Sequence, residues 1–188
     1  MKKCNICGED RIEEFYKHQR TRCKACQKAK QYEFNRKNPD YLKAKNQRRR
    51  AKKLALPNDL TTDQWKAILD RFENNCAISD STDIVLEHVI PLNFLHMGTS
   101  VNNVIPMDKT LNLSKRDKNI LEWVLEPEVA EVIYWGKFEA TMKYLAEVNG
   151  MTVEEYYEFI YFCEYNKRTV EEVKSESRSS VELFKADI

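Results

Sequence analysis

The spacing of four cysteines near the N-terminus constrains the fold more than any other feature of this sequence. Cys4-x2-Cys7 is followed, after fifteen residues, by Cys23-x2-Cys26. Each pair forms a tight turn that directs two thiolates at one ion, and two such turns complete the tetrahedron that zinc prefers. We therefore predict a structural Zn²⁺ site within residues 1–30, where metal binding replaces the core that so short a segment lacks. A redox pair of cysteines is the alternative, but the strand–helix context of such motifs is absent.

Charge is divided unevenly along the chain. Residues 1–56 contain 18 Lys and Arg against 6 Asp and Glu, whereas residues 57–188 contain 13 against 24. A basic arm on an acidic remainder suggests an anionic partner for the arm, and nucleic acid is the usual one. A solvated basic helix without a partner is the alternative. The candidate contacts to nucleic acid are Lys43, Lys45, Arg48, Arg49, Arg50, Lys52 and Lys53.

The pattern of apolar residues predicts an α+β chain of four segments. Residues 1–30 form a small zinc-binding module, and residues 31–56 form a basic helical connector with a turn at Asn38-Pro39. Residues 57–122 read as helix, strand, loop, strand and helix. Residues 123–188 form an acidic helical region.

Individual elements follow from local signals. Trp65, Ile68, Leu69 and Phe72 recur at helical spacing, so a helix is expected from about Thr62, with a cap from Thr61-Thr62. Strands are expected over 83–90 and 103–106, and a helix from about Asp108 through Trp123. In the last segment, Asn149-Gly150 marks a helix stop, and capping boxes begin at Thr152 and Thr169.

No run of about 18 apolar residues occurs, so no membrane span is expected. The N-terminal Met1 to Asn5 is not followed by the apolar stretch of a signal peptide. We therefore expect a cytoplasmic protein.

Residues 86–118 contain a motif in three separated parts. Leu86-Glu87-His88-Val89-Ile90-Pro91 comes first, Asn103-Val104 follows, and Leu111-Asn112-Leu113-Ser114-Lys115-Arg116-Asp117-Lys118 comes last. In order and spacing this motif resembles the HNH endonucleases, including small phage-borne and homing enzymes. The resemblance covers roughly residues 60–122. It implies a ββα-metal finger, and it implies a host-cell cytoplasm for a phage-encoded chain.

The resemblance assigns roles to these side chains. His88 is implied as the general base that activates water for phosphodiester hydrolysis. Glu87 and Asn112 are implied as ligands of a catalytic Mg²⁺ or Mn²⁺, which suit oxygen donors. Asn103 is implied as the residue that fixes the loop and orients His88, although Asn102 is one register away. Lys115 and Arg116 are implied as contacts to phosphate.

Two positions depart from the pattern of the family. Many members hold a second zinc ion through two CxxC pairs that flank the motif, but here Cys76 is the one cysteine among the four corresponding residues. We therefore expect no zinc in this domain and apolar packing of Cys76. The first carboxylate is Glu87, where Asp is commoner.

Several functions remain open from the sequence. DNA cleavage or nicking is the favoured activity, and RNA is not excluded as the substrate. The alternatives are a non-catalytic DNA-binding protein and an interaction protein of phage assembly, each derived from such a nuclease. The acidic C-terminal helices, with dense aromatic residues over 156–162, suit either a protein partner or homodimer contact or a packed helical cap.

Overall fold

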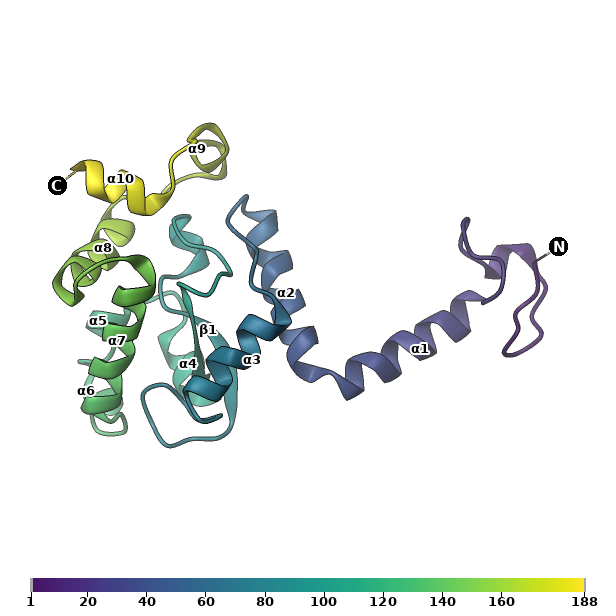
Figure 1. Cartoon of the computed structure of the whole chain (residues 1–188), viewed down its shortest axis with the longest axis horizontal. Coiled ribbons are helices and arrows are strands. Elements are labelled where there is room, and N and C mark those ends of the chain that lie inside the picture. Colours follow the sequence, from purple (N-terminus) through teal and green to yellow (C-terminus); the bar gives the residue numbers. More distant parts are fainter. Residues whose placement is uncertain (1, 188) are drawn as a thin grey trace. The chain divides into compact units, whose positions relative to one another are not determined.

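The computed structural model describes residues 2–187, without the side chains of Asp40 and Lys43. It has an α+β architecture, with ten α-helices and one two-stranded antiparallel sheet among these residues. The chain divides into two compact units, Met1–Leu42 and Lys43–Ile188 (Figure 1). The boundary lies inside the segment that the sequence predicted to be a basic connector.

The core of the first unit consists mainly of cysteine side chains. Its short 3-10 helix η1 (Ile12–Glu14) precedes the helix α1 (Lys24–Lys37), and none of the residues of α1 is buried. Its core consists of Cys4, Phe15 and Cys23, with Cys26 packed against them. One phenyl ring and three thiols bury too little apolar surface to hold a fold of this size, as the sequence predicted.

The basic helices break where the sequence indicates. α1 ends at Asn38, whose side-chain amide donates to the carbonyl of Phe34 at 2.8 Å. Pro39 then opens α2 (Pro39–Lys53), because a proline at the first helical position loses no hydrogen bond. Within the second unit, Ala44 and Ala51 of α2 are buried in two separate apolar clusters.

The expected helix, strand, loop, strand and helix are present. α3 (Thr62–Arg71) begins with a capping box between Thr61 and Gln64, and it buries Trp65, Ile68 and Leu69. The strands β1 (Ile84–His88) and β2 (Val104–Asp108) pair antiparallel, with His88 opposite Val104. The loop between the strands carries a short 3-10 helix, η2 (Leu92–Phe94).

The helix expected from Asp108 through Trp123 is interrupted, and that prediction was wrong. α4 (Lys109–Lys115) ends at Arg116, whose φ of +49° turns the chain. The Asn119 side chain then accepts a hydrogen bond from the backbone N–H of Leu121 and starts the helix α5 (Ile120–Trp123). An asparagine that can cap a new helix competes with continuation of the old one.

The C-terminal region packs on the motif region. The main cluster of buried apolar residues joins side chains of β2, and Val89 and Ile90 directly after β1, to those of α5, α7 and α8, and α7 and α8 also pack on each other (Figure 1). Cys76 lies in this cluster, which confirms the expected apolar packing of its side chain. The cluster therefore crosses the boundary that the sequence predicted near residue 122. The remaining helices are α6 (Pro127–Ala130), α7 (Trp135–Asn149), α8 (Val153–Tyr165), α9 (Val170–Ser175) and α10 (Ser180–Asp187).

Local signals in this region are confirmed. Thr152 and Thr169 form capping boxes, and Gly150 ends α7 with a φ of +65°. Of the aromatic residues over 156–162, Tyr156 and Phe159 are fully buried. These two rings belong to the packed cap. No helix in the described part of the chain is long and apolar enough to cross a membrane.

Candidate functional site

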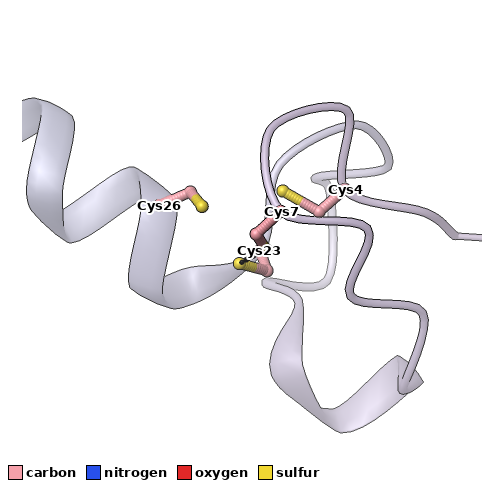
Figure 2. Close-up of side chains that lie close together, drawn as sticks. All are labelled: Cys4, Cys7, Cys23 and Cys26. Atoms are coloured by element: carbon pink, nitrogen blue, oxygen red, sulfur yellow. Dashed lines mark hydrogen bonds between the residues drawn. The ribbon is translucent and has the colours of Figure 1, made fainter.

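The four N-terminal cysteines converge, as Figure 2 shows. Cys4 and Cys7 come from the first loop, Cys23 immediately precedes α1, and Cys26 lies in its first turn. Their sulfur atoms all lie within 4.8 Å of one another, and the sulfurs of Cys7 and Cys23 are 3.5 Å apart. A tetrahedral zinc with bonds of about 2.3 Å needs sulfurs about 3.8 Å apart. The cluster could therefore hold a metal ion such as zinc.

The electrostatics of the cluster also suit a cation. Backbone N–H groups, first that of Cys23, lower the pKa of the Cys4 thiol to about 6. The neighbouring Cys7 side chain, followed by burial, raises the pKa of Cys26 to about 12. One thiolate thus forms readily and opposes the ionisation of its neighbours, whereas a bound metal cation favours the deprotonated form of every ligand.

A second site lies where β1 ends. A pocket of about 350 Å³, here called the Glu87–His88 pocket, opens between the end of α2, the end of β1, the following loop and α4. The first and the last part of the sequence motif are represented in its wall, whereas the middle part, Asn103-Val104, is not. Its lining residues are Arg50, Leu54, Glu87, His88, Pro91, Leu92, Asn93, Asn112, Leu113, Arg116 and Asp117.

His88 is the last residue of β1 and is 5% exposed. Its Nε2 lies 2.8 Å from the hydroxyl of Thr99, and no described residue hydrogen-bonds its Nδ1. Burial, together with the positive charges of Arg50 and Lys115, lowers the pKa of His88 to about 3. The imidazole is therefore neutral near pH 7 and is able to accept a proton.

Glu87 forms a buried ion pair. Its Oε1 accepts a hydrogen bond from the ammonium of Lys115 at 2.8 Å, and the same ammonium donates to the carbonyl of His88 at 3.0 Å. Burial raises the pKa of the Glu87 carboxyl, and the charge of Lys115 opposes this shift. The backbone N–H of His88 also lowers this pKa, and Oε2 is the carboxylate oxygen that does not accept the hydrogen bond from Lys115. Asn112, also in the wall, offers an amide oxygen.

Asn103 ties the loop after β1 into one conformation. Its amide accepts from the backbone N–H of Ile90 at 2.8 Å, and it donates to the carbonyls of Ile90 and Gly98. A Cβ at Gly98 would lie 1.9 Å from the backbone oxygen of Pro57, so only glycine permits this approach. Thr99 follows directly and hydrogen-bonds His88. Asn103, rather than Asn102, therefore has the contacts of a loop-fixing residue.

The basic residues separate into two groups. Arg50 and Arg116 line the Glu87–His88 pocket, whereas Lys115 is fully buried and faces Glu87 rather than solvent. The expectation that Lys115 contacts phosphate is therefore corrected, because its ammonium is occupied inside the protein. The side chain of Lys43 lies outside the described residues. The remaining cations of α2 are outside the pocket wall: Lys45, Arg48, Arg49, Lys52 and Lys53.

Sequence reasoning missed two polar residues at this site. Thr99 supports His88 from the loop, and Asp117 joins Arg116 in the pocket wall. Asp117 lies within the stretch from Asp108 through Trp123 that the sequence assigned to one helix. The sequence signal that could have identified Thr99 is its position directly after Gly98. The lack of a side chain at Gly98 lets this loop approach the backbone of Pro57.

Comparisons with protein-family models, with curated proteins and with solved structures found no match to this chain.

Proposed function

We propose that this protein is a metal-dependent endonuclease of the HNH type that hydrolyses phosphodiester bonds in DNA. The observation that carries this proposal is the convergence of Glu87, His88 and Asn112 on one pocket. A general base and two oxygen donors for a divalent cation, a carboxylate and an amide, are groups that such hydrolysis uses. They lie on a two-stranded sheet and the helix after it, which is the arrangement that the resemblance implies.

In this proposal His88 accepts a proton from the attacking water. The hydrogen bond to Thr99 fixes the ring, and its neutral state leaves a nitrogen lone pair for that proton. A pKa of about 3 makes the free imidazole a weak base. A bound phosphodiester would add negative charge beside the ring, and nearby negative charge favours the protonated form.

The oxygen donors of the pocket fit a divalent cation. Glu87 Oε2 and the Asn112 amide would hold Mg²⁺ or Mn²⁺, which prefer oxygen ligands. When bound, that ion would supply a Lewis acid for the phosphate and its leaving 3′ oxygen. The charge of Lys115 opposes the effect of burial on the Glu87 pKa and so favours the ionised carboxylate that a cation would bind.

Arg50 and Arg116 supply positive charge at the mouth of the pocket. Arginine binds phosphate oxygens through a planar set of donors. The further cations on α2 lie in the same helix as Arg50 and would contact the nucleic-acid backbone. The thiolate cluster would hold a structural zinc, since four sulfur ligands leave no position for water.

Cleavage of supercoiled plasmid tests the proposal. The wild type is incubated with Mg²⁺ or Mn²⁺ beside His88→Ala, and nicked and linear products are measured over time. Loss of the general base should lower the rate by roughly 10²- to 10⁴-fold. His18→Ala is the matched control, because it removes an exposed histidine of the first unit. A further reaction tests the need for a divalent ion. In it, Mg²⁺ and Mn²⁺ are left out and no chelator is added, so that zinc stays bound to the four cysteines.

One observation favours a second function. The charge of Glu87 is neutralised by Lys115, as in a buried structural ion pair. A protein that binds DNA without cutting it would need Glu87 only for this structural role. If neither the wild type nor His88→Ala cuts the plasmid, while both retard it in a gel, the nuclease proposal fails and the non-catalytic DNA-binding protein takes its place.

A further inference from the structure

We propose that a cavity in the first unit binds a phosphate of the nucleic-acid backbone together with its adjoining nucleotide. The cavity, here called the α1 cavity, measures about 240 Å³ and is lined by Arg22, Gln27, Lys30, Gln31, Phe34 and Tyr41. The inference rests on the part of the proposed function that makes nucleic acid the substrate. It adds a contact surface beyond the cations of residues 43–53.

Arg22 supplies an unused hydrogen-bond donor to this cavity. Its Nε is buried, and the described part of the chain offers that atom no acceptor. A buried donor without a partner costs on the order of 1–3 kcal/mol. A phosphate oxygen is the acceptor that an arginine donor binds most strongly, because the hydrogen bond is assisted by both charges. The side chain is therefore placed to gain a partner from outside the protein.

The charge of the cavity favours an anion. Arg22 and Lys30 are its charged lining residues, and no carboxylate lines it. No ion pair to either cation occurs among the described side chains, which do not include that of Asp40. The single acidic residue of α1, Glu33, is bound to Lys37 at 2.8 Å. The helix thus presents positive charge at the cavity without an internal counter-charge.

The aromatic wall of the cavity suits a nucleotide rather than a bare inorganic anion. Phe34 and Tyr41 meet edge to face, with ring centroids 5.3 Å apart. Phe34 remains 45% exposed, although a phenyl ring gains free energy from burial. Proteins that bind nucleic-acid strands combine a cationic groove with aromatic rings on which sugars or bases pack. Gln27 and Gln31 add amide groups that hydrogen-bond either phosphate or base edges.

Binding is measured by fluorescence anisotropy on the zinc-loaded full chain, with a labelled duplex and a single strand of the same length. All variants carry His88→Ala, and no divalent ion is added beyond zinc, so binding is separated from cleavage. Arg22→Gln and Lys30→Gln should each raise the Kd about tenfold. Each should also reduce the slope of log K against log salt by about 0.9 on the duplex, as expected for one lost phosphate contact.

Two control variants lie on the same helix. Lys28→Gln removes the same charge from an exposed position outside the cavity, and it should change the Kd by no more than about twofold. Phe34→Ala should weaken single-strand binding about tenfold, whereas Tyr32→Ala, which removes a ring that is 73% exposed and outside the cavity, should not. Zinc content is measured for each variant. If Arg22→Gln loses zinc because it adjoins Cys23, Lys30→Gln and Phe34→Ala decide the question.

Equal losses for Lys28→Gln and Lys30→Gln, with equal losses for Tyr32→Ala and Phe34→Ala, would overturn the inference. Binding would then depend on general charge, and water would fill the cavity. The plasmid assay stands apart from this result. If the protein cuts no plasmid but binds DNA through Lys30, the α1 cavity proposal is supported and the nuclease proposal fails. If the protein cuts plasmid but Lys30→Gln does not weaken binding, the nuclease proposal is supported and the α1 cavity proposal fails.

Discussion

Lys115 places a full positive charge in the interior of the second unit, where none of its side chain is exposed. Its three donors make two recorded hydrogen bonds, to Glu87 and to the carbonyl of His88. It thereby joins the end of α4 to the end of β1. Burying a charged pair is tolerated only where each partner neutralises the other, because desolvation of a lone ion is costly.

Replacement of Lys115 by methionine should therefore destabilise the protein strongly. Lys115→Met leaves the Glu87 carboxylate buried and unpaired, which costs about 3–5 kcal/mol in the free energy of unfolding. Urea unfolding followed by circular dichroism measures this loss.

Two further variants separate the ion pair from simple packing. The double variant Glu87→Gln/Lys115→Met removes both charges and should recover most of the loss. Lys118→Met removes an exposed partner of Glu126 and should cost less than about 1 kcal/mol. A double variant as unstable as Lys115→Met alone would show that side-chain packing, not charge, is what Lys115 contributes.

The residues of the pocket could be named from the sequence, but their contacts could not. The order of Glu87, Asn103 and Asn112 along the motif predicted which side chains to examine, and Glu87 and Asn112 line one pocket. The burial of Lys115 was not predictable, since a lysine in the last turn of a helix is usually solvated. The support of His88 by Thr99 depends on the path of a loop, and no periodic pattern encodes that path.

Among the elements, those with strong local signals were predicted best. The caps at Thr61, Thr152 and Thr169 and the stop at Gly150 each rest on a hydrogen bond or dihedral that one or two residues determine. The break after α4 was missed because a positive φ at an arginine has no sequence signature. The ends of the strands were predicted to within two residues. A closer prediction was not possible, because the ends depend on how the two strands pair in three dimensions.

His96 connects the loop after β1 to the last helices. Its Nε2 lies 2.6 Å from the carbonyl of Asn166, so that nitrogen carries the proton, and its Nδ1 is 3.2 Å from the hydroxyl of Ser180. Arg168 and the ring of Phe162 also face it. Burial, the largest cause, and the charge of Arg168 lower the pKa of His96 to about 4.

This shift predicts a loss of stability in acid. Because the folded pKa lies below the unfolded value of about 6.5, the unfolded state binds the proton more readily. The stabilisation is therefore complete above about pH 6.5 and is lost as the pH falls towards 4, by an amount on the order of 2 kcal/mol.

Thermal unfolding of the wild type and of His96→Gln between pH 4 and pH 8 measures this effect. His88 has a lowered pKa as well and contributes a slope of the same sign, so the difference between the two proteins isolates His96. Parallel pH profiles would contradict the prediction. The glutamine variant should show the shallower profile.

At the scale of the whole molecule, the two units depend on different sources of stability. The core of the first unit contains three cysteines and Phe15, whereas the second unit has a large apolar core that needs no metal ligand. The composition of the first 30 residues predicted this contrast, but the boundary at residue 42 was not predictable, since α2 runs across it without a change in sequence character.

With zinc held by the four cysteines as proposed, its removal should unfold the first unit and spare the second. With excess chelator, amide resonances of residues 2–42 should collapse towards random-coil shifts, because zinc binding supplies the folding free energy of such modules. The resonances of residues 43–187 should keep their dispersion. Added zinc should restore the first set, and a loss of both sets together would show that the second unit depends on the metal as well.

The sulfur-built core of the first unit also bears on how such a chain can change over generations. A module that folds on one ion needs few complementary side chains, so most of its surface is free to vary while Cys4, Cys7, Cys23 and Cys26 are kept. Recombination near the start of α2 would exchange the four-cysteine unit and leave the core behind Glu87 and His88 undisturbed. Under the proposed function, the contacts of the α1 cavity and the chemistry of the Glu87–His88 pocket would then be inherited separately.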